Sequence, residues 1–330
     1  MGSQSGNLEK NVQSELIRKR SKIFRIQDFI FEKFLWLLAV GFILVLASIF
    51  IVLYWQSKPV FEEVGILKFI FGTKWNPDEG LYGALPHIYG TLVTTTLAIL
   101  IATPLGFGIA IFLVELCPPK LRDFIGTLVE MLAAIPSIIY GIWGLYIFAP
   151  LMSKYVEPTL HAIFKDVPIL NELFNGYMFG TDFFTAGVVL AFMITPFIAA
   201  VTRDALNVVP PVLKESAYGL GATKTEVIIK VMFPFAKLAI VGSVILALGR
   251  ALGETMAVTF VIGNIPNITP HLFDPGTTIT STLANEFMEV AGKLDYAALL
   301  GLAFILFVVD FLILWVAKSI FLQKAQRYKL

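Results

Sequence analysis

The sequence predicts an all-α integral membrane protein with six transmembrane helices. Its 330 residues are 57% hydrophobic and only 15% charged, and their mean hydropathy is +0.80. Soluble domains carry about 25% charged residues. The apolar residues also occur in blocks of about 20, the length at which a helix crosses the hydrocarbon core. Such segments are expected to be helical because lipid cannot hydrogen-bond to an exposed backbone.

Six blocks are long enough to span a membrane. Trp55 ends the first block, which is not expected to be a cleavable signal peptide because it starts late, is long and lacks a small-residue cleavage site. Pro136 is expected to interrupt the third block and Pro196 the fourth, since proline lacks a backbone N–H. The fifth block contains two charges. The blocks cover approximately residues 34–55, 91–114, 124–150, 183–202, 236–262 and 297–317.

The basic residues predict the orientation. Eighteen Lys and Arg residues lie in the leader, in the segments 115–123 and 203–237 and in the tail after residue 317. The opposite loops, 56–90, 151–182 and 263–296, hold six Lys and Arg against twelve Asp and Glu. Because positive charge resists translocation, both termini are expected to be cytoplasmic, which agrees with an even number of spans.

Two domains are expected. Residues 1–33 would form a cytoplasmic leader, and residues 34–330 the transmembrane domain. Apolar and charged residues are mixed over 22–33, which favours a helix lying at the membrane interface. The alternative is an unstructured basic leader that only fixes the topology.

Several function classes are disfavoured. The net charge of +1 gives no bias toward nucleic acid. The single cysteine, Cys117, excludes an internal disulfide framework, and the three histidines have no metal-ligand spacing. The string Gly219–Thr225 resembles a phosphate loop, but Thr223 stands where that loop needs glycine. No nucleophile–base pattern occurs. We therefore expect no catalytic residue, no metal and no cofactor in this chain.

The segment 203–237 predicts a helix–turn–helix outside the membrane. Pro211 suits the first turn of a helix, which Gly219 and Gly221 would end. The pattern T-x-x-E over 223–226 is a capping box, which predicts a second helix through Val231.

Two charges lie in the fifth block. Arg250 is predicted near its centre, and Glu254, four residues later, would share its helical face. In one interpretation the two neutralise each other so that the helix can insert. In the other, Arg250 lies on a transport path and attracts an anion, for which a guanidinium is well suited.

The other polar residues in the blocks have simpler interpretations. Glu130 and Asp310 would pack against a basic or hydroxyl group. The second block has a threonine patch, whose hydroxyls would bond to their own helix backbone. A helix break at Pro136 would either face a cavity or be a simple kink. The patch consists of Thr91, Thr94 and Thr95.

The helix–turn–helix resembles the EAA loop of ABC-transporter permeases. Glu215, Ala217, Gly221 and Pro234 match the pattern E-A-A, G, nine residues, I-x-L-P. The resemblance implies a type I ABC importer permease of MetI-like fold with a cytoplasmic coupling helix that docks on a separate ATPase subunit. Glu215 would be the polar anchor there, Gly221 the turn and Pro234 the re-entry into the next span. The sequence departs from the pattern at Ser216, Val231 and Phe233.

Four strings are similar to the PstC family of permeases from the bacterial phosphate-specific ABC transporter. They are GTKWNP (72–77), IPSIIYGIWG (135–144), ESAYGLGATKTEVI (215–228) and LGRALGETMAVTFVIGN (248–264). The resemblance implies phosphate uptake through the bacterial inner membrane, with Arg250 and Glu254 on the substrate path. It also implies a PstA-like second permease, two PstB-like ATPase subunits and a PstS-like phosphate-binding protein as partners. A permease for sulfate, molybdate or phosphonate, and a phosphate-sensing scaffold, are the alternatives.

Overall fold

The computed structural model describes residues 2–326, with side chains for residue 24 and residues 27–319. Within this part of the chain, five helices are long and apolar enough to cross a membrane, or six if a bent pair counts as one span. The α-helices are α1 (Gly2–Val60), α2 (Ile66–Phe71), α3 (Leu85–Ile111), α4 (Pro119–Ala133), α5 (Ser137–Trp143), α6 (Ala149–Leu151), α7 (Glu157–Phe164), α8 (Pro168–Leu173), α9 (Phe183–Asn207), α10 (Pro211–Gly219), α11 (Lys224–Glu226), α12 (Phe233–Leu252), α13 (Met256–Val261), α14 (Ile279–Glu286) and α15 (Lys293–Gln326).

Tighter or wider helical turns and one small hairpin complete the elements. The π-helical turns are η1 (Phe61–Gly65), η3 (Phe112–Leu116), η4 (Gly144–Phe148), η5 (Met152–Val156) and η6 (Val227–Met232), and η2 (Pro77–Glu79) is a 3-10 turn. The strands β1 (Trp75–Asn76) and β2 (Leu81–Tyr82) pair antiparallel, with Trp75 opposite Tyr82.

The described chain divides into two units between Trp55 and Gln56. The first unit consists of the greater part of α1, which runs without interruption past residue 33. The side chains of 22, 23, 25 and 26 lie outside the described residues. The proposed division at residue 33 and the interfacial position of residues 22–33 stay predictions.

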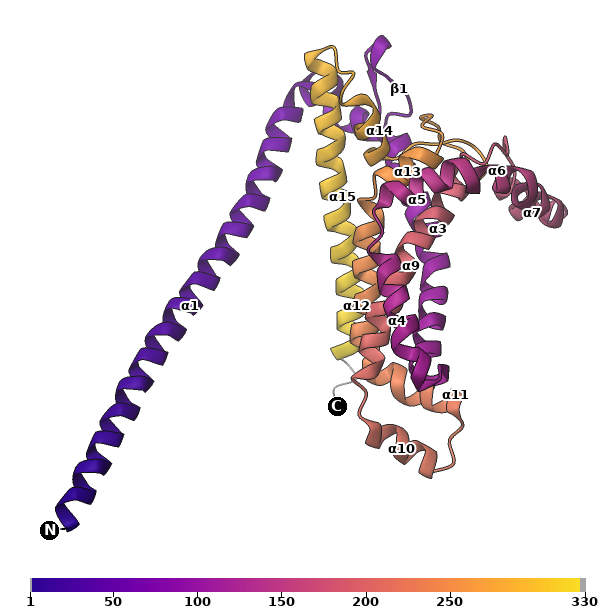
Figure 1. Ribbon diagram of the computed structural model, residues 1–330. Coiled ribbons are helices and arrows are strands. Elements are labelled where there is room, and N and C mark those ends of the chain that lie inside the picture. The colour runs from indigo at the N-terminus through magenta and orange to yellow at the C-terminus, as the bar shows by residue number, and fades with distance from the viewer. Residues whose placement is uncertain (1, 327–330) are drawn as a thin grey trace. The chain divides into compact units, whose positions relative to one another are not determined.

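The centre of the second unit is the packing of α3 against α9, with α12 beside them (Figure 1). Small residues allow this close approach. A Cβ on Gly106 of α3 would lie 2.7 Å from Ile198 Cγ2 of α9, so only glycine fits there. Ile194 and Ile198 are completely buried in this core. Hydrophobic helices that are buried on most sides, as α9 is, form the centre of a membrane bundle.

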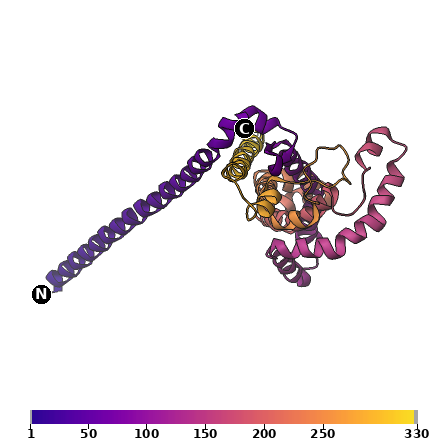
Figure 2. The same ribbon diagram turned by 90° about the horizontal axis from the view of Figure 1, so that it is seen from above.

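The third apolar block does not form one straight span. The helix axes of 119–133 and 137–164 differ by 85°. The break follows from Pro136, which disfavours helical geometry in the residue before it. The segment α5 to α7 then leaves the side of the bundle, as the magenta ribbon in Figure 2 shows. The prediction of a broken helix at Pro136 is confirmed, and the helix that follows the break continues beyond residue 150 to Phe164.

Two further boundaries correct the sequence-based expectations. Pro196 does not interrupt the fourth span, because α9 continues through it. The packing of neighbouring helices compensates for the missing N–H, as is common in membrane helices. The fifth span does not extend to residue 262, because α12 ends at Leu252 and α13 begins only at Met256.

The bundle has two distinct ends (Figure 1). The hairpin, α13, α14 and α7 lie at one end, whereas α10, α11 and the last turns of α15 lie at the other. The first end is held by aromatic packing around Trp75, whose indole Nε1 donates hydrogen bonds of 3.1 and 2.9 Å to the Glu286 carboxylate. The ring of His87 lies against Trp75, with centroids 4.8 Å apart.

Candidate functional site

The gap between α12 and α13 is the central irregularity of the bundle. Glu254 lies in this gap, and its Oε1 accepts a hydrogen bond of 3.1 Å from the backbone N–H of Ala257, at the start of α13. A carboxylate is favourable there because the first N–H groups of a helix have no partner within the helix. The backbone carbonyl of Glu254 accepts a second bond, of 2.7 Å, from Thr280 Oγ1 on α14. Glu254 is thereby fixed through both its backbone and its side chain.

Arg250 lies in the last turn of α12, and its side chain is exposed. The expectation that Glu254 follows it on the same helical face is wrong, because the helix ends between the two residues. Arg250 makes no ion pair within the part of the chain that the structure describes. Glu254 therefore does not neutralise Arg250 in this structure. The guanidinium does lie within electrostatic range of the Tyr140 hydroxyl on α5.

A buried group of hydroxyl residues surrounds the start of α14. Thr278 caps this helix, because its Oγ1 accepts from Ser281 N at 3.0 Å while Ser281 Oγ accepts from Thr278 N. Thr91 Oγ1 of α3 accepts from Ile279 N at 3.1 Å. These bonds fix α14 against the bundle. The run TTITST over 277–282 was the sequence signal for this cluster, which the analysis of the apolar blocks missed.

The threonine patch on α3 behaves largely as expected. Thr91 Oγ1 donates 2.8 Å to the His87 carbonyl, and Thr94 Oγ1 donates 2.8 Å to the Gly90 carbonyl. Both bonds go back one turn in the same helix, the usual arrangement for a hydroxyl in an apolar helix.

The opposite end of the bundle holds the predicted helix–turn–helix. The helix α10 begins at Pro211, and Gly221 then adopts a φ of +86°, which a side chain would strain. Thr223 Oγ1 and Glu226 form the predicted capping box. The second helix does not end at Val231, because η6 joins it to α12 and the helix runs from Lys224 to Leu252 without a break.

The four residues of the EAA pattern occupy different environments. Glu215 is exposed on α10, whereas Ala217, two residues on, packs against the apolar cluster beneath. Gly221 forms the turn. Pro234 lies in the first turn of α12, directly after the π-helical turn η6, inside the helix that runs from Lys224 to Leu252.

The predicted basic or hydroxyl partner is observed for Glu130 but not for Asp310. Glu130 Oε1 lies 2.6 Å from Arg203 Nη2, which also pairs with Asp204 at 2.9 Å. The prediction for Glu130 is thus confirmed, and its partner comes from α9, 73 residues away. Asp310 Oδ1 has no hydrogen-bond partner within the described residues.

Two buried carboxyl groups, which the sequence analysis did not single out, meet at the start of α9. Asp182 Oδ1 accepts from Thr185 N at 2.8 Å and so caps α9, and Thr185 Oγ1 donates to Glu157 Oε1 of α7 at 3.5 Å. Both acids are fully buried. Burial raises the pKa of the Asp182 carboxyl above its usual range, because a charge there would be removed from water.

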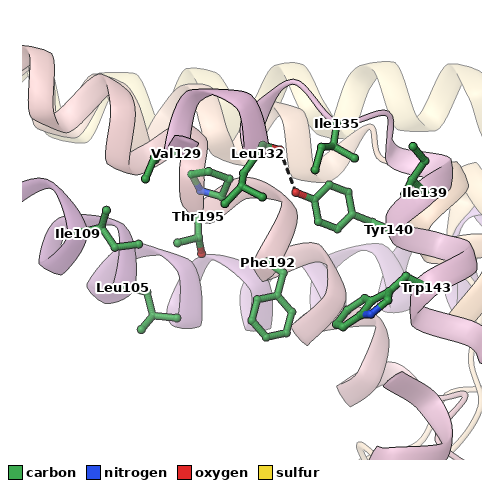
Figure 3. Close-up of a pocket in the computed structure, with 11 residues that line it drawn as sticks. Leu105, Ile109, Val129, Leu132, Ile135, Ile139, Tyr140, Trp143, Phe192 and Thr195 are labelled. Atoms are coloured by element: carbon green, nitrogen blue, oxygen red, sulfur yellow. Dashed lines mark hydrogen bonds between the residues drawn. The ribbon is translucent and has the colours of Figure 1, made fainter. Parts of the chain in front are cut away.

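A large apolar cavity of about 590 Å³ opens between α3, α4, α5 and α9 (Figure 3). The hydroxyl groups that line it have no free hydrogen to donate to an anion, since Tyr140 donates to the Leu132 carbonyl at 2.9 Å and Thr195 to the Ala191 carbonyl at 2.7 Å. A hydrated anion would find no charged group on its walls. The lining residues are Leu105, Ile109, Val129, Leu132, Ile135, Ile139, Tyr140, Trp143, Phe192, Thr195 and Pro196.

Comparisons with known proteins agree with this architecture. The sequence model of the family described as "Binding-protein-dependent transport system inner membrane component" matches residues 102–322. One chain of the MetNI methionine ABC transporter, in an inward-facing conformation, superposes with a TM-score of 0.52 at 18% identity, over 75% of this chain and 97% of that chain. That likeness shows a MetI-like fold.

Curated relatives are more similar still. The phosphate transport system permease protein PstC of Pasteurella multocida is 47% identical over 316 residues, which are 96% of this chain and 97% of the relative. PstC of Haemophilus influenzae is 50% identical over 79% of this chain and 82% of the relative. The probable PstC of Methanocaldococcus jannaschii is 39% identical over 71% and 74%.

The fold and these matches define the membrane-spanning subunit of an ABC importer. The chain belongs to the family of binding-protein-dependent transport system inner membrane components, and within it to the PstC permeases of phosphate transport systems. It is a multi-pass inner membrane component of a transporter whose ATPase is a separate subunit. The predicted fold class, family and transport function are confirmed.

Proposed function

We propose that Arg250 and Glu254 lie on the path along which phosphate crosses the membrane. The observation that carries this proposal is the helix break between them. Arg250 lies in the last turn of α12 as an exposed cation without a carboxylate partner among the described residues, and the Glu254 carboxylate accepts a hydrogen bond from the first turn of α13. Discontinuous membrane helices commonly form substrate sites, because they present helix ends and backbone groups to a cavity. A cation within a span usually faces such a cavity or a partner.

The path would lie between this chain and a PstA-like second permease. The exposure of Arg250 in the isolated chain supports this, because a charge on the outer surface of a single subunit would otherwise face lipid. Phosphate loses hydration as it enters, and the guanidinium offsets that loss with a planar set of donors suited to an oxyanion. A PstS-like binding protein would deliver phosphate at the end of the bundle that carries α13 and α14.

The opposite end would face the cytoplasm, with both chain termini on that side. The excess of Lys and Arg in the segments assigned to this side supports this orientation. The helix α10 would dock on one of two PstB-like ATPase subunits. Its exposed Glu215 would be the anchor, the turn at Gly221 would set the angle of the helix, and Ala217 would pack beneath it.

Coupling would be mechanical. The helix from Lys224 to Leu252 joins the turn after α10 directly to Arg250. At 1.5 Å per residue, the distance along this helix from Lys224 to Arg250 is about 40 Å. Closure of the ATPase dimer on ATP would shift α10 and hence this helix, which contains Pro234 in the first turn of α12. Packed rigid elements of this kind change between two discrete arrangements.

Phosphate uptake by complexes carrying Arg250→Gln tests the proposal. The complex is reconstituted in vesicles with its partner subunits, and assembly is checked by co-purification. We expect uptake to be abolished while assembly is retained, with Arg250→Lys keeping partial uptake because it preserves the charge. Normal uptake by the Arg250→Gln complex would refute the role of Arg250. Competition by sulfate and molybdate in the same vesicles measures the selectivity.

A further inference from the structure

Three basic side chains from three different elements converge on the last turn of the long second span. This turn is η3, at the end of α3. Arg122 Nη2 of α4 donates 2.8 Å to the Val114 carbonyl. Lys224 Nζ of α11 donates 2.9 Å to the Glu115 carbonyl. Lys214 Nζ of α10 lies 2.7 Å from Glu115 Oε1. The C-terminal end of a helix favours cations, because its last carbonyl groups have no partner within the helix.

Glu115 therefore binds both helices of the helix–turn–helix, one through its carboxylate and one through its carbonyl. The ion pair with Lys214 is sheltered, since the two side chains are 22% and 10% exposed. Exposed ion pairs contribute little, whereas removing one partner of a sheltered pair is costly. The pair Lys230–Glu226 illustrates the contrast, because it joins two residues of one helix and is 70% and 43% exposed.

Apolar packing also joins α10 and η6 to η3. Val114 of η3 is buried in one cluster with Val227 and Met232 of η6, and Ala217 of α10 packs against it. On α10, Lys214 and Ala217 are the two residues that are not exposed, whereas Glu215 between them is exposed. One face of α10 is thus fixed to the end of α3, and the other is free to meet a partner.

The helix α3 continues this connection through the bundle. It makes its most extensive contacts with α9, at close range around Gly106 and Ile198. At its far end, Thr91 accepts the hydrogen bond from Ile279 N of α14. A displacement of α10 would therefore reach the hydroxyl cluster beside Glu254 by a route separate from the helix 224–252.

We propose that the Glu115–Lys214 ion pair transmits the movement of α10 to α3, so that ATP hydrolysis is coupled to opening of the path. Both are positioning residues, since they act through helices and touch neither phosphate nor nucleotide. The proposal rests on the proposed function, because it assumes that α10 docks on the ATPase.

The test is the ratio of ATP hydrolysed to phosphate imported by the whole complex in vesicles. Lys214→Met removes the charge and keeps most of the length, and Lys230→Met is the matched control on the same segment. We expect the ratio to rise at least about fivefold in Lys214→Met, the lower end of measured coupling between sites. Lys230→Met should leave the ratio unchanged.

If the complex with Lys214→Met fails to assemble, a charge-exchange variant tests the proposal instead. The double variant Glu115→Lys with Lys214→Glu should restore much of the coupling that each single variant loses. A normal ratio in Lys214→Met, an equal effect in Lys230→Met, or no restoration in an assembled exchange variant would overturn the proposal. These outcomes differ from failure of the proposed function, in which Arg250→Gln would import phosphate normally.

Discussion

The hydrogen bond between Thr280 and Glu254 gives a sharp prediction about the helix break. Thr280→Val keeps the shape of the side chain and removes its hydroxyl. Thr280 is only 5% exposed, so water does not readily replace the lost donor. The Glu254 carbonyl, now 2.7 Å from Thr280 Oγ1, would lose this partner. The position of Glu254 between α12 and α13 would then be less strictly fixed.

The size of the effect follows from the burial. A buried polar group that loses its partner costs about 1–3 kcal/mol. Side-chain hydrogen bonds inside membrane proteins average about 0.6 kcal/mol, with a maximum near 1.7. We therefore expect a loss of about 1 kcal/mol, which corresponds to roughly a fivefold lower rate if Glu254 is held in place for transport. Assembly and basal ATP hydrolysis should be unchanged, because α10 is at the other end of the bundle (Figure 1).

The assay is initial phosphate import by reconstituted complexes. Thr280→Ser should recover most of the rate, because it restores the hydroxyl. Thr282→Val is the control, since it removes a buried hydroxyl of the same helix that bonds to Thr277 Oγ1 at 2.8 Å. Import at the wild-type rate in Thr280→Val, or an equal loss in Thr282→Val, would refute the assigned role of Thr280.

Three further predictions concern other parts of the bundle. Burial raises the pKa of Asp182, so the folded protein holds a proton there, and its stability falls as pH rises from about 3.9 through the raised pKa. Asp182→Asn preserves a cap on Thr185 and should flatten this pH dependence of stability in thermal unfolding. An unaltered slope would contradict the prediction. Gly221→Ala places a side chain at a φ of +86°, at a cost of about 1–2 kcal/mol, and should weaken ATPase docking in pull-down assays. Unchanged docking would argue against the role of this turn in positioning α10. Gly106→Leu should abolish folding by collision with Ile198, as judged by monodispersity in detergent, and a stable variant would disprove the close α3–α9 contact.

Much of the fold could be predicted because its signals are local. Runs of apolar residues predict spans, and the capping box at Thr223 and the break at Pro136 are encoded within a few neighbouring residues. The same local rules failed at Pro196, because packing of α9 against its neighbours outweighs the loss of one hydrogen bond.

The site was harder to predict because it depends on contacts between distant segments. The relation of Arg250 to Glu254 was inferred from helical periodicity, which does not apply across the break at residues 253–255. The donor to the Glu254 backbone carbonyl comes from 26 residues away, and Lys214 meets Glu115 across 99 residues. No periodicity in a single sequence encodes such pairs.

The most direct test of the central claim is chemical restoration of charge at position 250. Arg250→Cys is prepared with Cys117, the free buried cysteine, replaced by serine. After reconstitution, the new thiol is treated with a small cationic thiosulfonate or with a neutral one of similar size. The account predicts that the untreated complex does not import phosphate and that only the cationic reagent restores import. Wild-type import without treatment, or equal restoration by the neutral reagent, would contradict it.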